Sequence, residues 1–117
     1  MSLRSMKWEA MVAGAVLALT LGASRAAAQE PDGQALYLQN CRTCHGAKGV
    51  APARMAALYP TLKPLAGISL PADSIVAVLQ HGRGKDMKSF ADRLSAAQMA
   101  AVAKYIKSLP AAAPGAP

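Results

Sequence analysis

Apolar side chains recur at helical spacing in three stretches of the sequence after residue 28. In the stretch 32–40, Gly33, Leu36 and Tyr37 fall on one face at i, i+3 and i+4. Asp32 stands directly before this face and can cap the start of a helix. These positions predict a first helix over 32–40.

The second and third stretches, 73–81 and 95–109, have the same period and clearer ends. The apolar face of the second consists of Ile75, Val78 and Leu79. Asp73 or Ser74 is the expected cap of this helix, and Gly82 is expected to stop it. The apolar stripe of the third consists of Val102, Tyr105, Ile106 and Leu109. Ser95 followed by Gln98 has the pattern of a capping box, and Pro110 ends the helix.

The segments between these helices, 46–71 and 82–94, are broken by proline and glycine. Only the run 54–58 permits a short helical turn. No stretch alternates apolar and polar residues for long enough to predict a strand. The pattern therefore predicts an all-α fold of three main helices, with long loops that become ordered only around something bulky.

The first 28 residues have the three-part layout of a secretory signal peptide. Arg4 and Lys7 form a basic head, the run 11–23 is apolar and uncharged, and Ala26 and Ala28 supply the small residues for cleavage after residue 28. A retained membrane anchor is the alternative, but a run of 13 residues is shorter than the roughly 20 that a membrane-spanning helix requires. We predict a cleaved signal over 1–28, a periplasmic or otherwise exported protein, and no stable membrane span afterwards.

The rest of the chain is small and basic. Ten of the 13 Lys and Arg residues and five of the six Asp and Glu residues follow position 28, which leaves a formal charge of +5. Such a short chain buries a small share of its surface, so a large apolar cofactor would help it fold. The charge favours acidic protein partners, and no basic helical stripe interleaved with aromatic residues indicates nucleic acid. We expect one domain over 29–110 and a flexible tail of Ala, Pro and Gly over 111–117.

The chemistry centres on the run from Cys41 to His45 (CRTCH), because Cys-x-x-Cys-His is the attachment sequence of c-type haem. Two thiols three positions apart can each form a thioether with one haem vinyl group. The imidazole of His45 then lies where it can reach the iron from one face. The pattern predicts one covalently attached haem c, held by Cys41 and Cys44.

Three other interpretations of the motif are weaker. A thioredoxin-like redox pair needs a βαβ setting, which the pattern does not show. A zinc site could use Cys41, Cys44, His45 and His81, but adjacent Cys and His ligands fit structural zinc spacings poorly. A disulfide across two intervening residues would be strained.

The haem iron needs either a sixth ligand or an open site. The candidates are Met55, Met87, Met99 and His81. Met99 lies near the apolar face of the last helix and is interpreted as core, and Met55 as packing over an apolar edge. Met87 lies in the stretch 82–90, whose glycines let the backbone fold over the haem face opposite His45. We favour Met87 over His81, and interpret His81 as a residue at a helix end.

Together these features resemble a class I c-type cytochrome over residues 32–109. The resemblance rests on Gly33 with Tyr37, the motif followed by Gly46, the methionine loop 82–90, and Leu94-Ser95 leading to Tyr105-Ile106-Lys107-Ser108-Leu109. It implies a small cytochrome c-like fold around one haem. It also implies that the first and last helices cross at close range, where Gly33 and Tyr37 meet Tyr105.

The resemblance also assigns site residues. It implies Cys41 and Cys44 as the thioether cysteines, and His45 and Met87 as the axial ligands of the iron. The carbonyl of a middle-loop proline, Pro60 or Pro64, is expected to hold the Nδ1–H of His45. This chain departs from the family at Lys88, where proline often follows the ligand methionine, and the departure places a positive charge near the haem.

The function implied is electron transfer, without enzymatic activity, between respiratory or photosynthetic-type redox partners. A basic collar around the haem edge would attract partners with an acidic docking surface, and its candidate members are Arg42, Lys48, Lys85 and Lys88. The alternatives are a haem enzyme or gas-binding sensor with an open sixth site, and a haem subunit of a larger dehydrogenase or oxidase.

Overall fold

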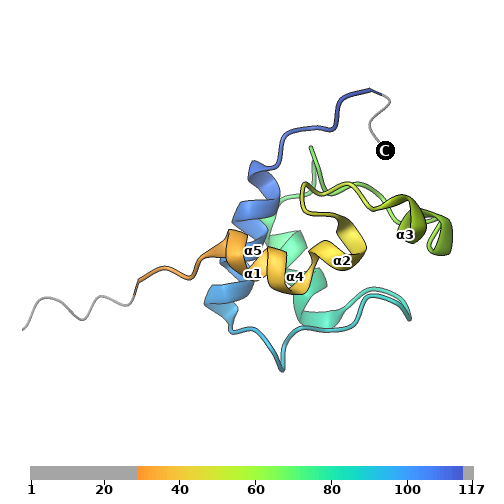
Figure 1. Ribbon diagram of the computed structural model, residues 1–117. Coiled ribbons are helices and arrows are strands. Elements are labelled where there is room, and N and C mark those ends of the chain that lie inside the picture. Colours follow the sequence, from red (N-terminus) through yellow and green to blue (C-terminus); the bar gives the residue numbers. More distant parts are fainter. Residues whose placement is uncertain (1–28, 115–117) are drawn as a thin grey trace, which may run out of the picture.

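The computed structural model describes residues 29–114, and its regular elements are helices (Figure 1). They are α1 (Gly33–Asn40), α2 (Arg42–His45), α3 (Ala53–Leu58), α4 (Ala72–His81) and α5 (Ala96–Ser108). In this range the β-type pairing is one isolated antiparallel bridge between Arg83 and Met87. The predicted all-α class is confirmed, and α1, α4 and α5 are the three main helices.

The first and last helices cross where the sequence predicted. Gly33 lies so close to α5 that a Cβ atom on it would overlap the carbonyl oxygen of Ala101. One turn further along, the rings of Tyr37 and Tyr105 meet at 5.2 Å between centroids, with an angle of 56° between their planes. The missing side chain at Gly33 is thus what lets the two backbones approach.

Helix α5 is the centre of the core, because both α1 and α4 pack against it (Figure 1). The expected capping box is present: the amide of Gln98 donates to Ser95 Oγ at 3.1 Å, and the Ser95 amide donates to Gln98 Oε1 at 2.8 Å. The buried core residues are Tyr37, Cys41, Ile75, Leu79, Phe90, Leu94, Met99, Val102, Ala103, Ile106 and Leu109. They come from all three main helices, from the segment before α5, from Cys41 between α1 and α2, and from Leu109 directly after α5.

The predicted cap of α4 was wrong. The helix begins at Ala72 after Pro71, and no side chain caps it, so neither Asp73 nor Ser74 has that role. Pro71 has a φ of −59°, which already suits the approach to a helix. Asp73 therefore lies inside the first turn, where its charge favours the positive end of the helix dipole.

The connection from α2 to α4 carries α3 (green), which lies apart from the packed main helices (Figure 1). The run expected to make a short turn is this helix α3. Two backbone bonds fix the connection: Leu65 donates to Gly49 O at 2.8 Å within it, and Gly67 donates to Leu109 O at 3.1 Å, which ties it to the residue after α5. The cavity described below therefore has a fixed wall here without any regular sheet or long helix.

Two predictions fall wholly or partly outside the described range. The signal peptide over 1–28 lies outside it, and so do residues 115–117 of the tail, while residues 111–114 are exposed and form no helix. Within 29–114, no helix combines the length and the apolar character that crossing a bilayer requires.

Candidate functional site

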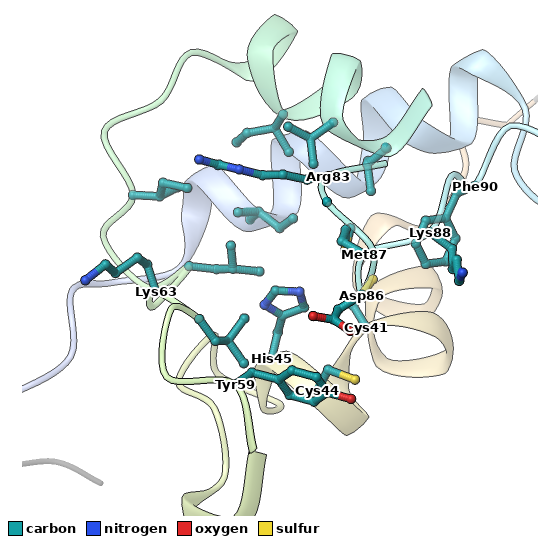
Figure 2. Close-up of a pocket in the computed structure, with 18 of the residues that line it drawn as sticks. Cys41, Cys44, His45, Tyr59, Lys63, Arg83, Asp86, Met87, Lys88 and Phe90 are labelled. Atoms are coloured by element: carbon teal, nitrogen blue, oxygen red, sulfur yellow. The ribbon is translucent and has the colours of Figure 1, made fainter. Parts of the chain in front are cut away.

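A cavity of about 630 Å³ lies between the corner joining α1 to α2, helix α4, and the loop that follows α4 (Figure 2). Most of its wall is apolar, with side chains that include Leu62, Leu65, Ile68, Leu70, Ile75, Val78, Leu79, Phe90 and Ile106. Cys41, Cys44, His45 and Met87 all line this one cavity. The four residues that the sequence singled out are therefore brought together.

The corner at Cys41 positions the two thiols and the imidazole. The Cys41 amide donates to Tyr37 O at 2.8 Å, and the Cys41 carbonyl accepts from the His45 amide at 2.9 Å. One helical turn thus places the side chains of Cys44 and His45 on the same face of the chain as that of Cys41. Figure 2 shows the His45 ring within the cavity, with both sulfur atoms to one side of it. Cys41 is buried, Cys44 is exposed, and neither forms a disulfide.

Burial controls the protonation of this corner. It raises the pKa of the Cys41 thiol to about 11, against a smaller lowering by the charge of Arg93. Burial also lowers the pKa of His45. At neutral pH the thiol therefore keeps its proton, and the imidazole is neutral with a lone pair available to a metal ion.

The loop after α4 carries Met87 into the cavity. It leaves the helix at Gly82, whose φ of 73° is disfavoured for residues with side chains. The Arg83 amide donates to Met87 O at 2.8 Å, and the Met87 amide donates to Arg83 O at 3.3 Å. Beyond the loop, the Phe90 amide donates to Leu79 O at 2.7 Å. The loop is thus closed on itself between Arg83 and Met87 and tied back to α4 by Phe90, and half-buried Met87 points into the cavity (Figure 2).

The other ligand candidates lie elsewhere. Met99 is in the core, as expected, and Met55 is half-buried on α3 without lining the cavity. His81 is exposed at the end of α4 and is also absent from the lining. Of the two prolines proposed to orient His45, Pro64 lines the cavity and Pro60 does not. In the described part of the chain, no group of three or more His, Cys, Asp or Glu side chains could hold a metal ion.

The charged side chains that line the cavity match only in part the basic collar predicted from the sequence. Lys85 and Lys88 line it, whereas Arg42 and Lys48 do not. Sequence reasoning missed the remaining charged lining residues, which are Lys63, Arg83, Asp86 and Arg93. Arg83 and Asp86 stand inside the methionine loop, so their place in the sequence was a usable signal. Lys63 and Arg93 gave none, because only the folded chain brings them to the cavity.

The residues present fit a covalent haem. A haem is a flat and largely apolar ring that carries two vinyl groups, and it takes nitrogen and thioether sulfur as axial ligands. The cavity offers apolar walls, two thiols that are not bonded to each other, one neutral imidazole and one thioether. This set of donors matches haem chemistry better than it matches zinc, because Met is a poor partner for zinc.

Comparison with known proteins agrees with a haem-binding site. Residues 28–106 match the sequence model of the family described as cytochrome c oxidase, cbb3-type, subunit III. The chain is 37% identical over 98 residues to the dihydro-haem d1 dehydrogenase of Pseudomonas aeruginosa, an alignment that covers 83% of this chain and 19% of that protein. The chain thus spans about a fifth of the length of this curated relative.

Solved structures share the fold. The KustC0563 c-type cytochrome superposes with a TM-score of 0.61 at 24% identity, over 68% of this chain and 99% of that one. Cytochrome c6 from the diatom Phaeodactylum tricornutum gives a TM-score of 0.53 at 26% identity, over 66% and 88%. The match over most of the chain, the shared fold and the fit of the cavity together show that this chain belongs to the cytochrome c family described by the cbb3-type subunit III model, whose members carry covalently bound haem c.

Proposed function

We propose that this protein transfers single electrons through one haem c, attached to Cys41 and Cys44 and ligated by His45 and Met87. The observation that carries the proposal is the meeting of these four side chains in one apolar cavity. Met87 is the methionine, among those in residues 29–114, that lines this cavity. When bound, haem c supplies a one-electron couple between Fe(II) and Fe(III).

The chain's own residues keep that site rigid and dry. Lowering of the His45 pKa by burial keeps the imidazole neutral, so its lone pair is available at neutral pH. We assign the carbonyl of Pro64 to hold the Nδ1–H of His45, since Pro64 lines the cavity and Pro60 does not. The apolar walls exclude water, and a site that keeps both ligands in each oxidation state reorganises little on electron transfer.

We further propose that the protein is exported and works as a carrier, without an enzymatic activity of its own. Its partners would be respiratory or photosynthetic-type redox proteins with acidic docking surfaces. Lys85 and Lys88 support this, because both line the cavity and are exposed to solvent. Exposed charges beside a docking site steer the encounter of two proteins and act mainly on the association rate.

A second candidate is a haem subunit bound within a larger dehydrogenase or oxidase. Two observations favour it: the relative named a dehydrogenase, which is far longer than this chain, and the family description, which names a subunit of an oxidase. In this role the same haem would pass electrons to or from another subunit. A haem enzyme or sensor with an open sixth site would instead require Met87 to stay off the iron.

The test is spectroscopy of protein matured in cells that attach haem c. A pyridine haemochrome spectrum reports two thioether bonds, and a near-infrared thioether–iron band reports Met87 on the ferric iron. We expect Met87→Ala to lose this band while keeping the haem, and Met55→Ala, the matched control, to keep both. A colourless wild-type protein with free thiols would refute the attachment, and a high-spin ferric wild type would favour an open site.

Size exclusion of the native protein separates the first two candidates. A free carrier elutes at the size of one small chain, whereas a bound subunit elutes with its larger partner.

A further inference from the structure

Two cationic side chains, Lys63 and Arg83, line the cavity at the side away from the cysteines. Figure 2 shows the Arg83 side chain extending along the wall near α4, and Lys63 on the segment before that helix, with Cys41 and Cys44 at the other side. Within residues 29–114, neither cationic group makes a side-chain hydrogen bond or an ion pair. Asp86, the one carboxylate in the lining, is paired with neither.

Arg93 is the contrasting case. Its guanidinium stacks over the ring of Phe90 at 5.1 Å and donates to Asn40 Oδ1 at 3.2 Å. It is also close enough to Cys41 to lower the pKa of that thiol. Arg93 is therefore held by the protein on the cysteine side, whereas Lys63 and Arg83 present unused charge to the cavity.

A haem c has a polarity of its own. Its two vinyl groups, which become the thioether links, lie on one half of the ring, and its two propionate groups lie on the other half. Attachment at Cys41 and Cys44 therefore turns the propionates toward the far side of the cavity. Two carboxylates placed there without cations would be costly to bury.

We propose that Arg83 and Lys63 bind the haem propionates and thereby raise the reduction potential of the iron. The inference rests on the proposed attachment at Cys41 and Cys44. The guanidinium of Arg83 can bind a carboxylate through two parallel N–H bonds, which fixes the ring as well as its charge. A positive charge there favours Fe(II), because reduction adds one negative charge to the site.

The experiment compares variants of the haem-loaded protein that each remove one positive charge from the cavity lining. Arg83→Gln and Lys63→Gln remove the proposed partners, and Lys88→Gln is the matched control, since Figure 2 shows Lys88 on the side of Cys41 and Phe90. Arg83→Lys keeps the charge without the planar fork. Mass spectrometry first establishes that each variant carries one haem.

We expect the equilibrium constant for reduction to fall at least threefold in Arg83→Gln, a drop in midpoint potential of about 28 mV at about 59 mV per tenfold change. Lys63→Gln should lower the midpoint potential as well. Lys88→Gln should lower it by less than half as much as Arg83→Gln does. Arg83→Lys, which keeps the charge, should have a potential close to that of the wild type. The propionate bending band of the resonance Raman spectrum should move in Arg83→Gln and stay in place in Lys88→Gln.

The outcomes separate the two proposals. A wild type without haem would overturn both the proposed function and this inference. Attached haem, together with equal shifts in Arg83→Gln and Lys88→Gln and an unmoved propionate band, would overturn this inference alone.

Discussion

Tyr37 links the helix crossing to the proposed haem corner. Its side chain is completely buried, and its hydroxyl donates to the carbonyl of Gly46, directly after His45, at 2.7 Å. Its ring also packs against Tyr105. One residue therefore fixes both the α1–α5 contact and the end of the short helix that carries the histidine.

Tyr37→Phe should lower the free energy of unfolding of the haem-loaded protein by about 0.5 to 1.5 kcal/mol. The buried Gly46 carbonyl loses its shorter hydrogen bond and keeps only the one from the Gly49 amide at 3.2 Å. Burial raises the pKa of Tyr37 well above its ordinary value, helped by the nearby Cys41 and Tyr105. The proton is thus held more tightly in the folded state. The stability that this supplies is complete below about pH 10 and is lost as pH rises through the pKa of the folded protein.

Guanidinium unfolding between pH 7 and 11 measures both the lower free energy of unfolding and its dependence on pH. The free energy of unfolding should fall less at alkaline pH in Tyr37→Phe than in the wild type. Tyr105→Phe is the control, since it keeps the hydrogen bond from Tyr37 to Gly46. Cys41 also has a raised pKa, but it does not titrate once it is bonded to haem. If the free energy of unfolding fell as much at alkaline pH in Tyr37→Phe as in the wild type, Tyr37 would not be the group responsible for the pH dependence.

At the scale of elements, the α1–α5 contact depends on the absence of a side chain at Gly33. Gly33→Ala should destabilise the protein by about 1 to 3 kcal/mol, because the added methyl group overlaps the Ala101 carbonyl and must push the helices apart. Gln34→Ala, at the next and exposed position of α1, is the control and should change stability little. Thermal unfolding measures both; equal stability of the two variants would mean that the crossing tolerates the methyl group.

The loop after α4 offers a pair of glycines that separate backbone strain from steric fit. Both have positive φ, 73° at Gly82 and 61° at Gly84. A Cβ atom at Gly82 would come within 2.5 Å of the Met87 carbonyl oxygen, whereas Gly84 has open space around it. Gly84→Ala therefore adds strain alone, about 1 to 2 kcal/mol.

Gly82→Ala should cost more than that and should also displace Met87. We expect a reduced near-infrared thioether–iron band in Gly82→Ala and an unchanged one in Gly84→Ala, measured on ferric protein. If both variants kept the full band, the closure of the loop by Gly82 would not be what positions the methionine.

At the scale of the whole molecule, charge is distributed unevenly around the cavity. Five Lys and Arg side chains line it against one Asp. Lys104, in contrast, lies on α5 and comes within 4.0 Å of Glu30, with both side chains highly exposed. With Lys63 and Arg83 assigned to the propionates and Arg93 held over Phe90, the exposed Lys85 and Lys88 are the positive lining charges available to a partner.

Lys88→Gln should slow electron transfer to an acidic redox partner about two- to fivefold at low salt, because one rim charge contributes about 0.5 to 1 kcal/mol to the encounter. Lys104→Gln is the control and should leave the rate nearly unchanged. Stopped-flow measurement over a range of ionic strength is the readout, since salt should bring the wild type and Lys88→Gln together. A wild-type rate independent of salt would rule out the docking surface.

The three main helices and the haem-attachment motif were predictable because their signals are local, whereas the one-turn helix α2 was not among the predicted elements. The apolar spacing that places Tyr37 against α5 and the capping box at Ser95 each lie within one or two turns of chain. The cap of α4 was predicted wrongly for a related reason: an Asp near a helix start suits both a cap and a first-turn position. The proline before it, not the side-chain type, set the boundary.

What the sequence determined by itself is therefore the three main helices and the reactive group, because helix period, capping and the spacing of two thiols and an imidazole act over a few residues. The sequence favoured Met87 over His81, and the structure places Met87 in the cavity. Only the tertiary structure decided that Pro64 rather than Pro60 lines the cavity, and that the cations Lys63 and Arg83 do so as well. These positions depend on the way in which the long loops close against α4 and α5. Loop closure depends on contacts between residues that are far apart in the sequence, and no local pattern connects them.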